Sequence, residues 1–474
     1  MKKAGLGGKC LNLLMSMYYN DCVMVKLAPN TFTDKIYFSK GVLQGDSCSP
    51  LAWSLYIANL ANELQKTEVG IKLGPAIISA LLFADDVALL SGTARKGINI
   101  LFKIINEYNH AYDLTLSLNK SHIMTNNDFI NSWKVGPQGE TIEESITAKY
   151  LGIDVTLNHR NITFYREEKV IKEAKAKAHT IQGLTRSGLE RANLTKELWE
   201  KCAVPSILYC SETLLISKQT IIKLDTVQNQ IGRFILQIPS SSANIMVWTD
   251  AGLMPIYGRV WMRKACYFWK LYHSTEDVLL KQCFDEISNT LEDPWTKQII
   301  EIEEKVGDFK ECTSIKQVKK MISSYIIQNL QITLNQQTST VALTTPLKWF
   351  AIQRHVNDST ASNTICKIRA GNLELGNRYP NSAGIYSKTC PLCCKQGLGL
   401  LPLDETHLLF FCKSLERVRK QQNITNFITE SQYPRISRDD LLRKYISNPD
   451  TTTTELMRRG RAATILKEKW LSLL

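Results

Sequence analysis

The sequence has no apolar run long enough to cross a membrane. Its longest apolar stretch, residues 77–90, contains two adjacent aspartates, Asp85 and Asp86, and follows Gly74-Pro75. Burying these two carboxylates in a bilayer would be costly. We therefore expect no transmembrane segment and no membrane partner.

The sequence also lacks the features of an exported protein. Two lysines lie near the N-terminus, but Lys9 interrupts the apolar part and no small-residue cleavage site follows. The 13 cysteines form an odd, scattered set, which suits free thiols and metal ligands in a reducing compartment rather than a disulfide framework. We expect an intracellular protein, nuclear or cytoplasmic, that is not secreted.

Internal repeats and extended low-complexity tracts are absent as well. The 474 residues, 44% of them hydrophobic, are enough for about two to four domains with cores of their own, and they exclude global disorder. The formal net charge of +13 favours a polyanionic partner such as nucleic acid.

Residues 1–160 have the pattern of an α/β unit. Residues 11–19 have a helical pattern, residues 23–37 alternate like strands around Pro29-Asn30, and an irregular loop follows. Asp46 or Ser47 could cap the next helix, which begins near Pro50. A hairpin around Asp85, another helix and a strand-like segment, residues 114–118, complete the unit.

The rest of the chain is mainly helical. Residues 166–330 show mostly helical periodicity, with lysine-rich faces and a break at residues 203–205. Residues 334–346 are uncharged and rich in Thr, Gln and Ser, which is typical of a linker. We expect a smaller unit over 346–474, with a cysteine cluster and a basic tail.

The two aspartates at the hairpin tip allow two interpretations. Asp is a common turn residue, so Asp85 and Asp86 could form an ordinary polar turn. Alternatively, carboxylates held at fixed spacing by buried strands are suitable ligands for Mg²⁺, and a two-metal site for phosphoryl transfer uses such ligands.

Four motifs in order support the second interpretation. They are GVLQGDSCSPL with Gln44 and Gly45, FADD from Phe83 to Asp86, LNKSHIM with Lys120, and YLGI from Tyr150. Their order and spacing resemble the palm of a reverse transcriptase, more narrowly that of non-LTR (LINE-type) retrotransposons. Weaker patterns after the palm resemble the helical thumb and its extension in the same family.

The resemblance implies a fold and a set of roles. It implies an α/β palm remnant with an antiparallel sheet and packed helices over 1–160, followed by a helical thumb and extension over 161–335. Asp85 and Asp86 would bind two catalytic Mg²⁺ ions, and Lys120 could approach the incoming triphosphate. The segments that would contact nucleotide, template or primer are Phe83, Ala84, Gln44, Gly45, Tyr150, Leu151 and Gly152. The implied partners are an RNA template, a DNA primer or target, and deoxynucleoside triphosphates.

The C-terminal cysteines suggest a second metal. Cys390, Cys393, His407 and Cys412 have the composition of a tetrahedral, structural Cys₃His zinc site, and the segment resembles the family's zinc knuckle. Cys394 could replace Cys393. Buried free cysteines beside a surface histidine are the plain alternative. The nearby Lys413, Arg417, Arg419 and Lys420 could contact phosphates.

The resemblance also predicts a gap. Palm polymerases of this family need a third carboxylate from an earlier motif, and upstream of Gln44 only Asp21 and Asp34 are available, neither in the expected context. We therefore expect an N-terminally truncated enzyme that is inactive in this form. A nucleic-acid-binding protein without catalysis is the alternative.

Overall fold

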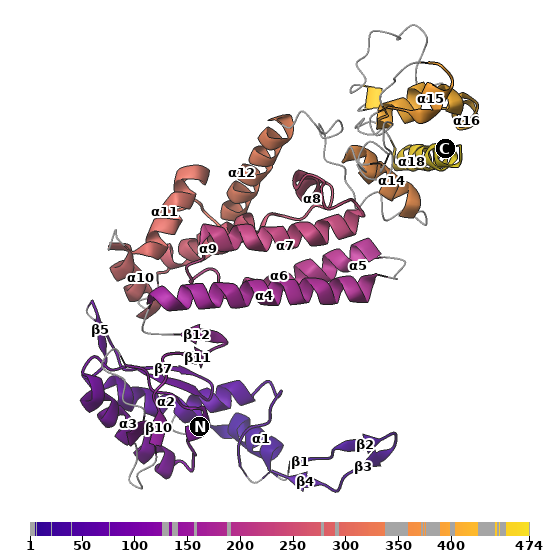
Figure 1. Ribbon diagram of the computed structural model, residues 1–474. Coiled ribbons are helices and arrows are strands. Elements are labelled where there is room, and N and C mark those ends of the chain that lie inside the picture. Colours follow the sequence, from indigo (N-terminus) through magenta and orange to yellow (C-terminus); the bar gives the residue numbers. More distant parts are fainter. Residues whose placement is uncertain are drawn as a thin grey trace. The chain divides into compact units, whose positions relative to one another are not determined.

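The fold is described from a computed structural model of the chain (Figure 1). The structure describes residues 5, 7–19, 21–38, 40–74, 76–125, 132–134, 141–155, 159–186, 191–275, 279–289, 293–336, 359–370, 373, 375, 389–398, 403–424, 441, 442, 445 and 452–473. Within these residues, no helix combines the length and the apolar character that a membrane crossing needs. Most of the described chain is helical, and its sheets are small and antiparallel.

The chain forms two compact units. Unit 1 comprises Met1–Phe164 together with Glu276–Asn289, and unit 2 comprises Tyr165–Thr275 together with Thr290–Leu474. Unit 1 therefore contains a segment that interrupts unit 2 in the sequence. Its helices are α1 (Gly8–Tyr18), α2 (Ser49–Gln65), α3 (Ala94–Ala111), the 3₁₀ helix η2 (Leu118–Lys120) and α10 (Leu279–Asn289).

The described strands of unit 1 pair two by two. The pairs are β1 (Cys22–Val23) with β4 (Ile36–Tyr37), β2 (Lys26–Ala28) with β3 (Thr31–Phe32), β5 (Ile71–Leu73) with β6 (Ala76–Ile78), β7 (Ala80–Phe83) with β8 (Asp86–Leu89), β9 (Ser132–Lys134) with β10 (Thr141–Glu143), and β11 (Ala148–Tyr150) with β12 (Ile153–Val155). All six pairs are antiparallel. The sheet predicted for the palm is thus present, in the described residues, as separate hairpins.

One face of the β7–β8 hairpin packs on helices α2 and α3. Leu82 and Val87, which are paired across the hairpin, point to this face. Leu60 and Leu64 of α2 and the apolar face of α3 bury the same cluster. The residues of this cluster recur at helical spacing in both helices: Ile57, Leu60 and Leu64 in α2, and Leu101, Ile105 and Tyr108 in α3.

Two local predictions for unit 1 are wrong. Residues 114–118 do not form a strand. Leu116 and Leu118 pack toward Phe102, while Thr115 and Ser117 are exposed, so the alternation reflects burial alone, with no neighbouring strand paired to the segment. The residue before α2 is Cys48, which makes no capping hydrogen bond through its side chain. Asp46 instead accepts hydrogen bonds from Tyr18 and Ser49.

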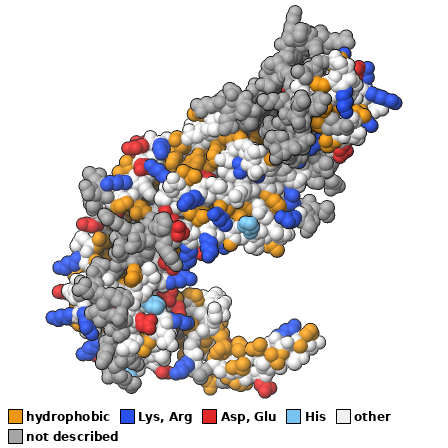
Figure 2. Space-filling view, in the orientation of Figure 1, with side chains coloured by type: hydrophobic (Ala, Val, Ile, Leu, Met, Phe, Trp, Pro, Cys, Tyr) orange, Lys and Arg blue, Asp and Glu red, His pale blue; other side chains and the backbone are white. Residues whose placement is uncertain are grey.

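Strands β1 to β4 form an arm, residues 22–37, whose side chains are mostly exposed. The turn at Pro29-Asn30 is present as predicted, with Asn30 at φ 65°. None of the residues in these four strands is buried, and Figure 2 shows hydrophobic side chains along the arm. The exposed apolar residues in and beside the strands are Val23, Met24, Val25, Leu27, Phe32, Ile36, Tyr37 and Phe38.

Unit 2 is built from helices, as the periodicity predicts. They are α4 (His159–Thr185), which begins in unit 1, α5 (Arg191–Leu198), the π-helix η3 (Trp199–Ala203), α6 (Val204–Ile207), α7 (Lys218–Leu236), α8 (Ile245–Thr249), α9 (Ile256–Tyr272), α11 (Pro294–Val306), α12 (Ile315–Gln336), α14 (Ser359–Arg369), α15 (Pro391–Lys395), the π-helix η6 (His407–Phe411), the 3₁₀ helix η7 (Lys413–Leu415), α16 (Glu416–Gln421) and α18 (Thr453–Ser472). The break predicted at residues 203–205 is a π-turn leading directly into α6, with Pro205 in its first turn. Pro205 has no N–H to donate, and it lies where the π-helix η3 changes into α6.

A buried polar chain connects the middle helices. The Trp199 indole donates to Gln228 Oε1 at 3.1 Å, and Gln228 donates to the Met254 carbonyl at 2.9 Å. Asp225 of α7 accepts from the Ile256 backbone N–H at 2.8 Å, and burial raises the pKa of Asp225 to about 6. These contacts fix α7 against the start of α9.

In the C-terminal part of unit 2, α14 and α18 pack closely along each other (Figure 1). The hydroxyls of Thr364 and Thr464 are 2.7 Å apart. A side chain at Gly460 would place its Cβ 2.4 Å from the Ala361 carbonyl oxygen. Glycine at position 460 therefore lets the two backbones approach.

A buried ion pair connects this C-terminal part to the middle helices. Arg369 ends α14, and Asp250 directly follows α8. The guanidinium donates to both carboxylate oxygens of Asp250, at 2.8 and 3.0 Å, and both side chains are fully buried. One hydrophobic cluster includes residues from both parts.

The division into domains at 1–160, 161–335 and 346–474 stays a prediction. Residues 334–336 of the predicted linker belong to the end of α12, and residues 337–346 lie outside the described residues.

Removing one partner of the buried ion pair is expected to destabilise unit 2. Arg369→Met leaves the Asp250 carboxylate without its guanidinium in the core, which costs about 3–5 kcal/mol. The measurement is urea-dependent labelling of Cys366, a fully buried thiol in α14. Lys218→Ala, which removes an exposed pair with Glu301 at 3.1 Å, is the control and should cost less than about 1 kcal/mol. Equal effects of the two changes would contradict this role of the pair.

Candidate functional site

The hairpin formed by β7 and β8 presents both aspartates to solvent. Phe83 pairs with Asp86, which leaves Ala84 and Asp85 as a two-residue turn. Phe83 and Asp86 lie on the face opposite the Leu82–Val87 pair, because neighbouring residues of a strand point to opposite faces. Asp85 and Asp86 are both exposed, so a cation can reach both carboxylates from solvent.

Ala84 has an unusual backbone conformation. Its φ is 50°, whereas Asp85 is not among the residues with positive φ, which is the pattern of a type II′ hairpin turn. A residue with a Cβ adopts this region at a cost of about 1–2 kcal/mol. The turn therefore needs support from outside the hairpin.

Helix α2 gives that support. The Trp53 indole Nε1 donates a hydrogen bond to the carbonyl oxygen of Ala84 at 2.6 Å. Trp53 therefore connects the FADD turn to the helix that follows the Gln44-Gly45 loop.

A second hairpin turn lies near the aspartates. Leu151 and Gly152 join β11 to β12, with φ of 48° and 80°, the pattern of a type I′ turn. Burial raises the pKa of Tyr150, and the negative charge of Asp86 raises it further. The charge of Asp86 therefore reaches Tyr150, the first residue of the YLGI motif.

The Gln44-Gly45 loop is tied to its neighbouring helices. Gly45 has φ 92°, a conformation that favours glycine. Just beyond it, Asp46 accepts from the Tyr18 hydroxyl of α1 at 2.8 Å, which lowers the pKa of Asp46. Gln44 and Gly45 themselves are exposed, and the contacts that the structure shows do not join them to Asp85 or Asp86.

Lys120 is not brought to the aspartates. It lies exposed at the end of η2, and no hydrogen bond or ion pair connects its ammonium group with Asp85 or Asp86. Among the described residues, no third histidine, cysteine or carboxylate groups with the two aspartates into a potential metal site. The candidate Mg²⁺ site thus has two protein ligands in the described part of the chain.

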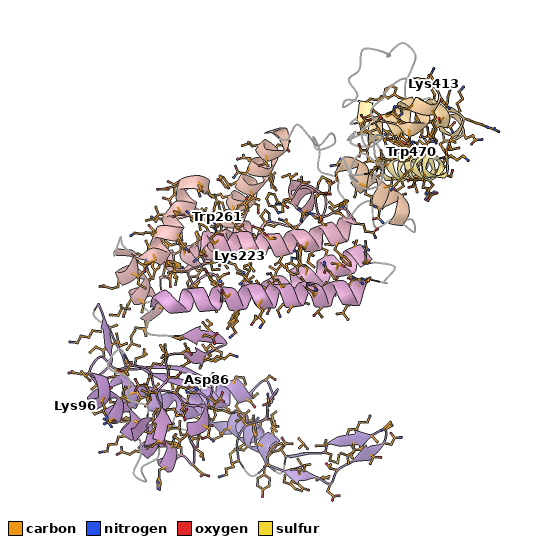
Figure 3. The ribbon with its side chains drawn as sticks, viewed as in Figure 1. Asp86, Lys96, Lys223, Trp261, Lys413 and Trp470 are labelled. Carbon is orange, nitrogen blue, oxygen red and sulfur yellow. The ribbon has the colours of Figure 1, made fainter. Side chains whose placement is uncertain are left out.

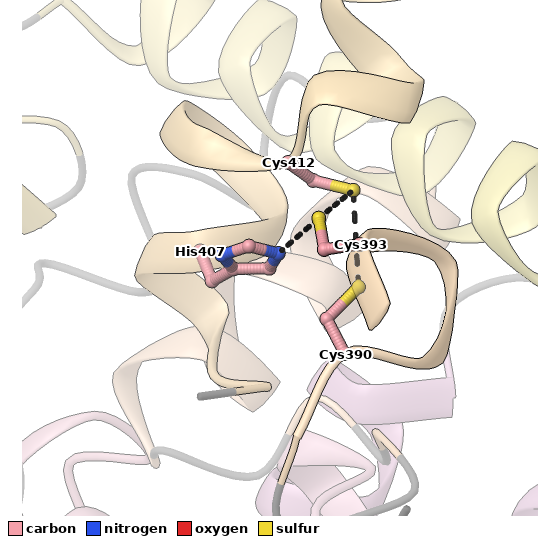
Figure 4. Close-up of side chains that lie close together, drawn as sticks. All are labelled: Cys390, Cys393, His407 and Cys412. Atoms are coloured by element: carbon pink, nitrogen blue, oxygen red, sulfur yellow. Dashed lines mark hydrogen bonds between the residues drawn. The ribbon is translucent and has the colours of Figure 1, made fainter. Parts of the chain in front are cut away.

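The cysteines near the C-terminus form a compact, buried cluster (Figure 4). One ligand atom each from Cys390, Cys393, His407 and Cys412 lies within 4.8 Å of the others, and all four side chains are buried. Cys390 and Cys393 flank the start of α15, His407 begins η6, and Cys412 follows it. Cys394 is not in this group, so the geometry favours Cys393 as the fourth member.

The distances in the cluster suit a tetrahedral zinc ion. With Zn–S near 2.3 Å and Zn–N near 2.1 Å, ligand atoms in a tetrahedron are about 3.8 Å apart for two sulfurs and about 3.6 Å for sulfur and nitrogen. The Cys412 Sγ atom lies 3.9 Å from Cys390 and 3.8 Å from Cys393, and Cys393 Sγ lies 3.4 Å from His407 Nε2. A disulfide would need about 2.05 Å. The four residues fit the ion.

The thiols of the cluster share protons unevenly. A hydrogen bond from the Cys412 thiol lowers the pKa of Cys390 to about 3, although burial acts in the opposite direction. The same hydrogen bond raises the pKa of Cys412. Zinc ligands must be deprotonated, and Cys390 is the thiol that these contacts prepare for that state.

One of the predicted phosphate contacts is wrong. Arg419 is buried, and its guanidinium donates to the carbonyl oxygen of Cys412, so it supports the knuckle from within. Lys413, Arg417 and Lys420 are exposed, although Lys420 also pairs with Glu416 at 3.1 Å. Figure 3 shows Lys413 with Trp470 in the C-terminal part.

The part of the chain that contains the β7–β8 hairpin matches a known protein family. Residues 9–155 match the family described as reverse transcriptase (RNA-dependent DNA polymerase). This segment of the chain resembles a reverse transcriptase domain. The matched segment includes α1, the Gln44-Gly45 loop and the FADD and YLGI hairpins.

Two retrotransposon proteins are similar to part of this chain. The Drosophila melanogaster "Retrovirus-related Pol polyprotein from type-2 retrotransposable element R2DM" is 35% identical over 82 residues, 17% of this chain and 8% of that protein. The Popillia japonica "Retrovirus-related Pol polyprotein from type-1 retrotransposable element R2" is 32% identical over 91 residues, 19% of this chain and 15% of that protein. The resemblance of the reverse transcriptase domain to those of non-LTR retrotransposons is confirmed. The aligned segments span less than a sixth of either relative.

Trp53 is a residue of the reverse transcriptase domain whose role the sequence does not reveal. In the sequence it is one member of the apolar face of α2, and only the structure shows its indole at the Ala84 carbonyl. An indole N–H acts as a donor to any carbonyl within reach, so no local pattern identifies the partner.

Substitutions at Ala84 should test the strain in the turn. Ala84→Val is expected to make hydrogen exchange of residues 80–89 roughly tenfold faster, because a β-branched residue is disfavoured at positive φ. Ala84→Gly should slow that exchange, or leave it unchanged. Ala88→Val, in the regular strand β8, is the control and should not accelerate exchange. Equal behaviour of the two valine variants would contradict the strained turn.

Proposed function

We propose that this chain is the reverse transcriptase portion of a non-LTR retrotransposon, which copies RNA into DNA by metal-assisted nucleotidyl transfer. The observation that carries the proposal is the FADD hairpin, because it presents two exposed carboxylates at a supported turn inside the segment that matches reverse transcriptases. The proposed partners are an RNA template, a DNA primer or target, and deoxynucleoside triphosphates.

Each motif has a proposed role. Asp85 and Asp86 hold Mg²⁺, which when bound stabilises the charge on the attacking and leaving oxygens. The Trp53 hydrogen bond keeps the turn, and hence Asp85, at a fixed place. The turn at Leu151-Gly152 positions the primer end, with Tyr150 and Phe83 beside the aspartates. Gln44 and Gly45 line the nucleotide and template pocket, and Lys120 approaches the incoming triphosphate.

The FADD hairpin supplies only two carboxylate ligands, which limits the catalytic activity of this chain alone. Two adjacent carboxylates leave most positions around a metal ion to water and substrate, and within the described residues no third acidic side chain joins them. Loss of one anionic ligand weakens the metal site and misplaces the attacking hydroxyl. We therefore propose that synthesis requires a further carboxylate beside Asp85 and Asp86, and that the 474-residue chain alone is inactive.

The Cys₃His cluster is proposed as a structural zinc site. Four buried ligands at tetrahedral separations leave no open position for chemistry. Zinc there would join α15 to η6. The exposed Lys413 and Arg417 beside it are available for phosphates.

Primer extension on an RNA template tests the catalytic proposal. The chain alone should give no product, and addition of a palm segment that carries an aromatic–aspartate motif should restore synthesis. In the restored enzyme, Asp85→Ala should abolish extension, because the metal loses a ligand.

The control is Asp34→Ala, an exposed aspartate in the arm of the same unit. It should leave extension in the restored enzyme unchanged. A folded, restored protein that makes no DNA, or an active Asp85→Ala variant, would count against the proposal.

A nucleic-acid-binding protein without catalysis is the second candidate. The specific observations for it are the net charge of +13 and the two-ligand metal site. Such a protein would use the basic helical surface and the knuckle to hold RNA or DNA.

Salt dependence of binding tests this candidate. Affinity for a single-stranded RNA should fall steeply with added salt, because released counterions drive phosphate binding. The double variant with Lys413→Ala and Arg417→Ala should reduce the log–log slope by up to about two. Lys218→Gln, which removes one exposed positive charge far along the sequence in α7, is the comparison. An affinity insensitive to salt would contradict the candidate.

A further inference from the structure

The arm formed by β1 to β4 exposes apolar side chains and an open strand edge. Phe32 and Tyr37 are 52% and 61% exposed, and within the described residues no further strand pairs with the arm. Figure 1 shows the arm extending away from the other elements of unit 1. A two-stranded hairpin that buries so little is only marginally stable in water, and contiguous exposed apolar surface marks an interaction site.

The outer edge of β3 and β4 presents backbone groups at these two aromatic residues. The N–H groups of Thr33 and Phe38 donate to carbonyl oxygens of the opposite side of the hairpin, at 3.0 and 3.2 Å. Along an antiparallel strand, residues that bond inward alternate with residues that do not. Phe32 and Tyr37, the neighbours of the two donors, therefore turn their own N–H and C=O groups to the outer edge.

Asp34 and Lys35 lie between the two aromatic residues, in a bulge. The pairing on either side leaves both of them opposite the single residue Met24, which is the arrangement of a β-bulge. The extra residue shifts the alternation, so Phe32 and Tyr37 face the same edge although they are five positions apart. Both charged side chains are exposed, and neither forms an ion pair within the described residues.

This edge is complementary to a second copy of itself. If two such edges pair antiparallel with Asp34 facing Lys35 of the second copy, then Lys35 faces Asp34 of the second copy, because the arrangement is two-fold symmetric. In the same register, Phe32 faces Tyr37 of the other chain in both directions. Both residues of each aromatic pair then have backbone groups free at the shared edge, as antiparallel pairing requires.

The aromatic side chains of these pairs also lie on one face of the sheet. Phe32 pairs with Lys26 and Tyr37 pairs with Cys22 within the hairpin. Positions 22 and 26 are an even number of residues apart on one strand, so their side chains point to the same face. Facing aromatic side chains on one face are favourable cross-strand pairs.

The charges select this register. A charged residue or a bulge at a strand edge ordinarily prevents edge-to-edge pairing, because each copy then presents the same charge to the other. Here two adjacent charges of opposite sign lie at the centre of the edge, so each faces its opposite in the two-fold register. Opposite charges directly across a strand pair stabilise it, whereas like charges destabilise it.

We propose that the arm is a dimerisation element: the β3–β4 edges of two copies of this chain pair antiparallel, with Asp34 of each copy facing Lys35 of the other. The four strands then form one sheet. The paired edge is short compared with the interfaces of permanent dimers, so we expect a reversible dimer in the micromolar range. The inference goes beyond the proposed function and does not depend on it, because dimerisation involves none of the residues assigned to DNA synthesis.

Complementary charge reversal tests the register. Asp34→Lys leaves only positive charges at the centre of the edge, and Lys35→Asp leaves only negative charges. Each variant alone should dimerise about tenfold more weakly or less, since two attractive pairs become repulsive. An equimolar mixture of the two variants should dimerise like the original chain, because opposite charges face each other again. Sedimentation velocity of the nuclease-treated, full-length chain over a range of concentrations measures the dimer.

Lys72→Asp is the matched control. Lys72 is an exposed lysine of β5, so the variant changes the net charge as Lys35→Asp does, and it should dimerise like the original chain. An original chain that stays monomeric throughout the micromolar range would overturn the inference. So would a dimer that neither reversal weakens, or a mixture of folded variants that does not recover it. Reversals that alter RNA affinity but not sedimentation would identify a nucleic-acid contact instead, and would also overturn it.

Cross-linking of the original chain covers the case in which the variants do not fold. A carbodiimide joins a carboxylate to an amine in direct contact, forming an amide bond while the reagent takes up the water as a urea. In a mixture of ¹⁵N-labelled and unlabelled chains, mass spectrometry should find Asp34 of one chain joined to Lys35 of the other. A dimer that gives no mixed-isotope product at this pair would contradict the proposed interface.

Discussion

A carboxylate and a guanidinium lie fully out of water at the place where α14 meets the end of α8. Charges in such a position are tolerated only with close, paired partners, so Asp250 and Arg369 must stay together for both segments to stay folded. Helix α14 in turn holds α18 through the close backbone contact at Gly460. The buried pair is therefore the first link in a series that reaches from the middle helices to the knuckle.

The two candidate metal sites of this chain follow opposite physical rules. Asp85 and Asp86 are exposed at a hairpin tip, which suits an ion that keeps part of its water shell and meets substrate phosphates. Cys390, Cys393, His407 and Cys412 are buried, which suits a soft-ligand site that excludes water and holds a fold together. One site must stay open to its substrate, and the other contributes by being closed.

The sequence predicts much of this architecture, and its failures have physical causes. Helix α3 and the FADD hairpin follow from hydrophobic periodicity, because burial of one face is a local property of the sequence. The segment 114–118 alternates in the same way, yet no strand lies beside it, and pairing depends on residues far away.

The four cysteine and histidine ligands are recognisable by type and spacing. The sequence does not distinguish Cys393 from Cys394 as the ligand, because the distinction depends on the direction in which each side chain leaves α15. Trp53 acts through a single indole N–H whose partner lies in another element, so no spacing rule finds it.

Unit 1 is discontinuous in the sequence, since it includes Glu276–Asn289 as well as Met1–Phe164. The chain therefore passes between the units three times, and the segment 165–275 of unit 2 lies between the two parts of unit 1 in the sequence. The order of synthesis is affected as well. The ribosome must complete residue 289 before unit 1 has all its parts, and by then the segment 165–275 of unit 2 has already been made. Folding during translation thus cannot finish the first unit before the second begins.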